Sequence, residues 1–147
     1  MRKQDVPQDA ALLEQWREIN YAVDEDGRYR LIPSAGWDAS NLANVQAWQA
    51  VTEAIAAALR QVRSGQASPL AFHMARHQMD VGLLAAYAGL ARWRVRRHLQ
   101  VSHYQKLSAA LRGRYAAVFN IPMETLDLVP ERLDLPAWLT EADRGLD

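Results

Sequence analysis

The chain of 147 residues contains no cysteine, which excludes disulfide bonds, thiolate metal sites and cysteine nucleophiles. It also lacks a long apolar run. Its longest uncharged apolar stretch, which includes Leu83 to Ala91, is far shorter than the ~20 residues of a membrane-spanning helix. The first residues are polar and charged, without the apolar segment of a secretion signal. We therefore expect a soluble, cytoplasmic protein with no membrane partner.

Net charge is absent as well, because 17 basic side chains balance 17 acidic ones. The distribution of charge is uneven, however. Residues 67–115 hold eight basic side chains, one acidic side chain and all four histidines, whereas the segments on either side are acidic. Such a basic block favours an anionic partner, most often a nucleic acid. A basic face that pairs with the acidic C-terminal tail explains the asymmetry equally well.

Catalytic motifs are missing: there is no Walker loop, dinucleotide-binding glycine pattern or Gly-x-Ser-x-Gly motif. His73 and His77 have a spacing that can bind a metal on one helix face. No glutamate lies between them, and no acidic third ligand is close in sequence. Core or surface histidines are the favoured interpretation. We predict a protein that is not an enzyme and has no cofactor and no metal site.

The N-terminal part predicts a β-hairpin. Residues 19–23 alternate apolar and polar side chains, residues 24–27 supply turn chemistry, and residues 29–32 resume a strand-favouring run. The alternating apolar residues are Ile19, Tyr21 and Val23. A two-stranded hairpin is marginally stable by itself, so we expect it to lie on the helix that follows. Residues 10–19 are expected to form a short helix.

A long helix is predicted after the hairpin, because no proline or glycine interrupts residues 41–64. Asp38 and Ser40 are candidate N-caps, and Gly65 suits the C-terminal end. One apolar stripe recurs at helical spacing, formed by Val45, Trp48, Val51, Ile55, Leu59 and Val62. Alanines on the other faces permit close approach by a second helix. The stripe serves either dimerisation or packing within the chain.

The middle of the chain predicts three short helices. Ser68 and Pro69 start the first helix, which runs to about Gln78. Asp80 caps the second, residues 81–88, and a turn containing Gly89 leads to the third, residues 92–99. Expected inward positions are Leu70, Phe72 or His73, Met74 and His77 in the first helix, and Leu83, Leu84 and Tyr87 in the second. Two short helices around a glycine turn, the second rich in arginine, are typical of a helix-turn-helix.

Residues 69–126 resemble the five-helix domain of the lambda-repressor/Cro family, the xenobiotic-response-element type. The resemblance rests on Leu84-Ala85, Gly89-Leu90 and Val95, and on residues 111–126, which resemble the family's fourth and fifth helices. The resemblance implies a five-helix helix-turn-helix domain. The β-hairpin and the long α-helix predicted from the N-terminal sequence are not part of that family's domain, and together the predictions give a mainly α protein in which they precede it. The expected domains are residues 1–66, a possible dimerisation unit, residues 67–127, and an acidic, apolar tail over residues 128–147.

The resemblance implies double-stranded DNA as partner and transcription regulation as function. The third helix, Arg92 to Leu99, would lie in the major groove as the recognition helix. By their position in this helix, the residues expected to contact bases are Arg92, Trp93, Arg96 and Arg97, with Arg94 nearer the DNA backbone. The residues expected to contact phosphates are Lys106, His103, Tyr104, Arg112 and Arg114. Val95 and Leu99 would face the core, with Met74 matched to Leu99. Because such domains read two half-sites, a homodimer is expected.

A protein-interaction module that kept the helix-turn-helix fold without reading DNA is the alternative. Trp93 is bulky for its position, and the predicted recognition helix lacks small polar residues. The two functions differ in one observable feature. Arg92, Arg96 and Arg97 stand free on the surface in a DNA-binding protein, whereas an interaction module has them covered by the acidic tail.

Overall fold

The computed structural model describes residues 1–8 and 17–134, and for residues 38–41 it describes the backbone alone. Contacts divide these residues into two compact units, Met1–Gln49 (unit 1) and Ala50–Asp134 (unit 2). The domain boundaries predicted after residues 66 and 127 stay predictions. Most of the helix predicted over residues 10–19, and the tail from residue 135, lie outside the described residues. In the described part, no helix is both long and apolar enough to span a membrane.

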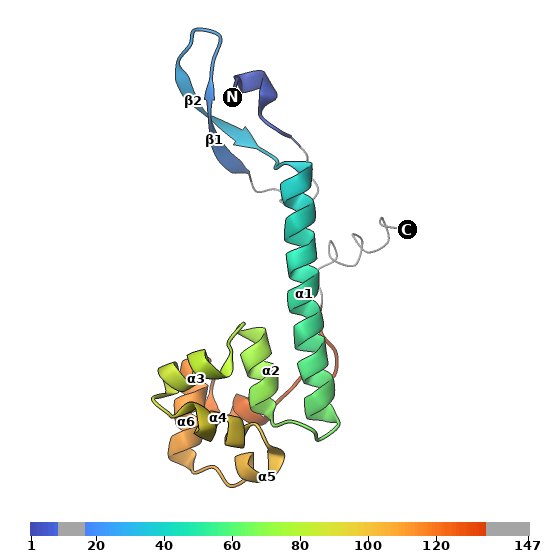
Figure 1. Ribbon diagram of the computed structural model, residues 1–147, viewed down its shortest axis with the longest axis vertical. Coiled ribbons are helices and arrows are strands. Elements are labelled where there is room, and N and C mark those ends of the chain that lie inside the picture. Colours follow the sequence, from blue (N-terminus) through green and yellow to red (C-terminus); the bar gives the residue numbers. More distant parts are fainter. Residues whose placement is uncertain (9–16, 135–147) are drawn as a thin grey trace. The chain divides into compact units, whose positions relative to one another are not determined.

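The described residues are mainly helical, with one antiparallel hairpin and six α-helices, as the sequence predicts at this coarse level (Figure 1). In unit 1, a 3-10 helix η1 (Lys3–Asp5) precedes strands β1 (Glu18–Val23) and β2 (Tyr29–Ser34). Helix α1 (Asp38–Arg63) begins in unit 1 and ends in unit 2. Unit 2 continues with α2 (Pro69–Arg76), α3 (Val81–Ala88), α4 (Arg92–His98), α5 (Val101–Tyr104), α6 (Ala109–Val118) and the 3-10 helix η2 (Met123–Asp127).

The hairpin forms where alternation and turn residues predict it. Asp24 closes the turn, since its carboxylate accepts hydrogen bonds from the amides of Asp26 and Arg28. Gly27 has a φ of 76°, which glycine adopts without strain. The alternating apolar face is not covered by the helix on which the hairpin was expected to lie, because Ile19 and Tyr21 are 67% and 71% exposed.

The opposite side of the hairpin is the buried one. The N-terminal segment lies beside β1, where the amide of Val23 donates to the carbonyl of Met1. Ser34 of β2 donates from its hydroxyl to the carbonyl of Pro7. The small side chains of Ala22 and Ser34 let the backbone of the N-terminal segment lie close to the two strands. The buried residues of unit 1 are Val6, Ala22, Ser34, Ala35, Gly36 and Val45.

Unit 2 has a continuous apolar core drawn from all its short helices. Its buried members are Leu70, Met74, Leu84, Ala85, Ala88, Val95, Tyr104, Tyr115, Phe119 and Leu126. Ser68 connects the start of α2 to the end of α4. Its amide donates to the carbonyl of Leu99 at 2.8 Å, and its hydroxyl donates to that of His98 at 2.9 Å. Ser68 therefore occupies the N-cap position of α2, but its side chain is hydrogen bonded to the end of α4 and does not cap α2.

Local signals around α3 are confirmed. The carboxylate of Asp80 accepts a 2.7 Å hydrogen bond from the amide of Leu83, and Gly89 ends the helix at a φ of 64°. The expected burial of Leu83 and Tyr87 is wrong, because they are 42% and 68% exposed. Nearly every α3 residue is apolar, so helical periodicity does not identify the inward side. Packing selects Leu84, Ala85 and Ala88 instead.

The last two elements occur where the sequence predicts them, although the second is a 3-10 helix. Asn120 follows α6 with a φ of 51°, and the chain then enters η2, in which Leu126 is fully buried. His73 of α2 is buried, and its Nε2 donates to the carbonyl of Leu126 at 3.0 Å. This bond fixes η2 against α2.

Candidate nucleic-acid interface

Helix α4 presents arginines on its outer side and buries its inner side. Val95 is fully buried and His98 nearly so, as three-residue spacing on one helix face requires. Arg92, Arg96 and Arg97 are exposed, and Arg94 is half-buried. Trp93, at 63% exposure, stands among them. The predicted contact residues of this helix are thus available at the surface, with Arg94 the least accessible.

The arginines of α4 form no ion pair with a carboxylate in the described part of the chain, although Asp80 lines the same groove as Arg92 and Arg96. Ion pairs there join Arg30 to Asp24, Arg60 to Glu53 and Arg112 to Asp127, and none involves α4. The guanidinium groups remain able to form forked hydrogen bonds, the geometry with which arginine binds phosphate oxygens and guanine edges.

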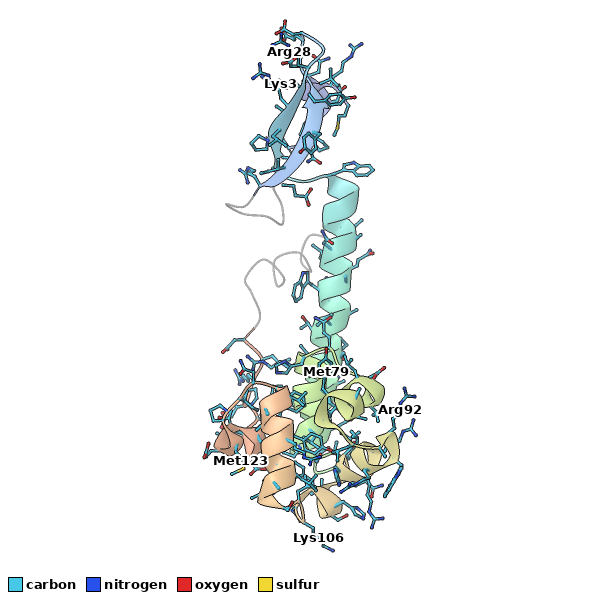
Figure 2. The ribbon with its side chains drawn as sticks, turned by 90° about the vertical axis from the view of Figure 1, so that its left-hand side faces the viewer. Lys3, Arg28, Met79, Arg92, Lys106 and Met123 are labelled. Atoms are coloured by element: carbon cyan, nitrogen blue, oxygen red, sulfur yellow. The ribbon has the colours of Figure 1, made fainter. Side chains whose placement is uncertain are left out.

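A groove lies between the start of α3 and α4, and Arg92 and Arg96 line it with Gln78 and Asp80. The guanidinium of Arg92 lies against Gly82 of α3. A Cβ at Gly82 would stand 3.3 Å from Cζ of Arg92 and 3.2 Å from Oδ1 of Asp80. Gly82 thus leaves room for this arginine, whose side chain projects outward in Figure 2. No local sequence pattern indicates this role of Gly82, because it depends on a contact between residues ten positions apart.

His98 anchors α4 from within. Its Nδ1 is hydrogen bonded to the Tyr115 hydroxyl at 2.8 Å, and the two rings meet edge to face. Burial lowers the pKa of His98, and the nearby positive charges of Arg94 and Arg97 lower it further. The imidazole is therefore neutral at pH 7, so α4 gains a buried polar anchor without a buried charge. Neither residue was a predicted site residue.

Further basic residues lie after α4. Lys106 follows α5 and is exposed, and Figure 2 shows it at the surface of unit 2. Arg114 of α6 is exposed, and His103 of α5 is half-buried. The structure therefore leaves Lys106 and Arg114 accessible at the surface, and their contact with phosphates stays a prediction.

Tyr104 and Arg112, predicted as phosphate contacts, both have side chains that are engaged inside unit 2. The Tyr104 hydroxyl donates to Asp127 at 2.6 Å, and Arg112 donates to both oxygens of that carboxylate. The Arg112 guanidinium also lies over the Tyr104 ring. Partial burial opposes ionisation of Asp127, but the bonds from Tyr104 and Arg112 outweigh it and lower the pKa of the carboxyl.

The two histidines with metal-binding spacing differ in burial, because His73 is buried and His77 is exposed. His73 uses its Nε2 for the carbonyl of Leu126. His77, expected on the inward side, is exposed, with its ring centroid 5.2 Å from that of Phe119. Across the described residues, no group of three histidine or acidic side chains is arranged to hold a metal ion.

Comparison of the chain with protein-family models, curated proteins and solved structures finds no match. The lambda-repressor/Cro resemblance therefore stays a prediction from the sequence.

Proposed function

We propose that unit 2 is a helix-turn-helix domain of the lambda-repressor/Cro type that binds double-stranded DNA through α4, and that the protein regulates transcription. One observation carries this proposal. Helix α4 exposes Arg92, Arg96 and Arg97 without any carboxylate partner in the described residues, while Val95 holds the opposite face in the core.

The elements around α4 support the same function. Asp80 starts α3, Gly89 allows the sharp turn into α4, and the two helices are in contact, which supports a helix-turn-helix arrangement. In such a domain, arginine forks pair with guanine O6 and N7 in the major groove or with phosphates. Trp93 offers an apolar surface of the kind that contacts the thymine methyl group. A homodimer would place two copies of α4 on two half-sites.

The test compares two variants that each remove three positive charges. Arg92→Ala/Arg96→Ala/Arg97→Ala removes the exposed arginines of α4. The control, Lys3→Ala/Arg28→Ala/Arg132→Ala, removes exposed basic side chains outside α4. Fluorescence anisotropy with a random-sequence duplex, at several salt concentrations, measures the affinity and its salt slope.

We expect the α4 variant to bind at least ~10-fold more weakly, with a salt slope reduced by about 1 for each lost phosphate contact. The control should bind like the wild type within about twofold. Equal loss in both variants would indicate a general charge effect and contradict the proposal. So would an α4 variant that remains folded and keeps its affinity.

The alternative, a protein-interaction module, is favoured by the exposure of large apolar side chains on the same two helices. Leu83, Tyr87 and Trp93 are 42–68% exposed. The same titration separates the two functions, because an interaction module that lost DNA reading binds the duplex only weakly even at low salt. Such a module would be affected equally by the two charge variants.

A further inference from the structure

Unit 1 carries an exposed apolar surface that the proposed function does not use. The pairs Ile19–Pro33, Tyr21–Leu31 and Val23–Tyr29 lie directly opposite each other across β1 and β2, so their six side chains share one face of the hairpin. We call this surface the hairpin face. Ile19, Tyr21, Tyr29 and Leu31 are 67%, 71%, 77% and 57% exposed, Pro33 is exposed, and Val23 is half-buried.

The other face of the hairpin is already occupied by its own chain. Ala22 and Ser34 on that side are each 1% exposed. A two-stranded sheet is marginally stable unless its apolar face is covered, and contiguous exposed apolar patches mark interaction sites. The hairpin face is therefore the side that needs a partner.

The hairpin face has the charge pattern that pairing with an identical copy requires. In a two-fold interface each surface meets itself, so a charged residue near the axis meets a like charge. All six positions of the hairpin face are uncharged. The charged strand residues, Glu18 and Arg30, belong to the other face, where Arg30 is paired with Asp24.

The area also suits a dimer. At their exposed fractions, the four large side chains present roughly 600 Å² of surface, compared with the ~800 Å² per partner of a standard interface. The stripe of α1 is less available. Val45 and Leu59 are buried, and Val51, Ile55 and Val62 are half-buried within the chain.

We propose that two copies of the chain pair through their hairpin faces, with Tyr21 of one chain packed against Leu31 of the other around a two-fold axis. The interface assigns the expected homodimer to the hairpin rather than to the α1 stripe. It involves no residue of α4 and is tested without DNA, so its failure is distinguishable from failure of the DNA-binding proposal.

Charge substitution on the hairpin face provides the first test. Tyr21→Lys/Leu31→Lys places four charges at the two-fold axis, counted over both chains. Tyr87→Lys/Leu128→Lys is the matched control, because Tyr87 and Leu128 are 68% and 65% exposed in unit 2. Light scattering at micromolar concentration should give twice the chain mass of 16.6 kDa for the wild type and the control. The hairpin variant should give the monomer mass with an unchanged circular dichroism spectrum.

Cross-linking provides a second readout that does not depend on disrupting the interface. Because the chain lacks cysteine, Tyr21→Cys and Tyr87→Cys each introduce a unique thiol. A short bismaleimide should link Tyr21→Cys chains into dimers and leave Tyr87→Cys chains monomeric. A monomeric wild type, a hairpin variant that stays dimeric, or equal linking of both cysteine variants would each overturn the proposal. A monomeric wild type would assign the hairpin face to a different partner.

Discussion

Buried polar side chains in unit 2 are each satisfied by one specific partner. Tyr115 is fully buried and bonded to His98, and His73 is bonded to the carbonyl of Leu126. Among the described residues, no buried side-chain nitrogen or oxygen lacks a hydrogen-bond partner. Removing one member of such a pair leaves the other buried and unpaired, which costs more than the bond itself contributes.

Tyr115→Phe tests this pairing directly. The substitution keeps the ring in the core but removes the hydroxyl, and Nδ1 of His98 loses its partner. We expect the free energy of unfolding to fall by about 1–2 kcal/mol, measured by urea denaturation. The exposed Tyr87 supplies the control, since Tyr87→Phe should change stability by less than ~0.5 kcal/mol. Equal effects of the two substitutions would show that the His98–Tyr115 bond is not significant.

The buried histidines predict acid sensitivity. Burial lowers the pKa of both His73 and His98 below the ordinary value of 6.5. The unfolded chain therefore binds protons more readily, so this contribution to stability is complete above pH 6.5 and is lost as the pH falls through the folded-state pKa values. His73→Gln retains a donor for the carbonyl of Leu126 but cannot titrate. Its melting temperature should fall less than that of the wild type between pH 7 and pH 5, and parallel decreases would contradict the assignment.

At the scale of elements, the turn between α3 and α4 depends on a left-handed residue. Gly89 has a φ of 64°, and nothing lies within 4 Å of a Cβ built there. Gly113 lies inside α6, also without a neighbour within 4 Å and without a positive φ. A Cβ fits equally well at both glycines, so the effect of a substitution differs only through the backbone conformation of each position.

Gly89→Ala and Gly113→Ala should therefore have opposite effects. Alanine at position 89 must adopt a left-handed conformation, which costs about 1–2 kcal/mol. Alanine in α6 gains helix propensity and should stabilise the protein by roughly 0.5–1 kcal/mol. Thermal unfolding of the two variants and the wild type should show a lower melting temperature for Gly89→Ala and a higher one for Gly113→Ala. Destabilisation by Gly113→Ala would show that α6 is packed more closely there than the structure indicates.

The elements also show which features are readable from sequence. Asp80, Gly89 and Val95 act within a few residues of their own position, so capping, turn chemistry and periodicity predict them. The hairpin was predicted by alternation, but its buried face was not, because Ala22 and Ser34 are small and give a weak hydrophobic signal. The roles of Tyr104 and Arg112 depend on Asp127, which is 23 and 15 residues away. Non-local contacts of this kind leave no local pattern.

At the scale of the whole molecule, the main apolar cluster of unit 2 is drawn from residues 70–126, and the buried Leu59 of α1 lies outside that cluster. The exposed apolar face that we assign to pairing lies in residues 19–33. The main core of unit 2 and the proposed association of chains therefore depend on different segments, and truncation can test whether they are separable.

Deleting residues 1–66 should leave a helical, cooperatively folding fragment that no longer dimerises. Its affinity for duplex DNA should fall by on the order of 10²-fold or more, because the second α4 no longer binds as part of the same molecule. Light scattering gives the mass and fluorescence anisotropy gives the affinity. The Tyr21→Lys/Leu31→Lys variant of the full chain is the matched control, and it should lose the same affinity while keeping residues 1–66. A truncated fragment that remains dimeric would place the interface in unit 2, where the exposed Tyr87 and Trp93 would be the first surfaces to test.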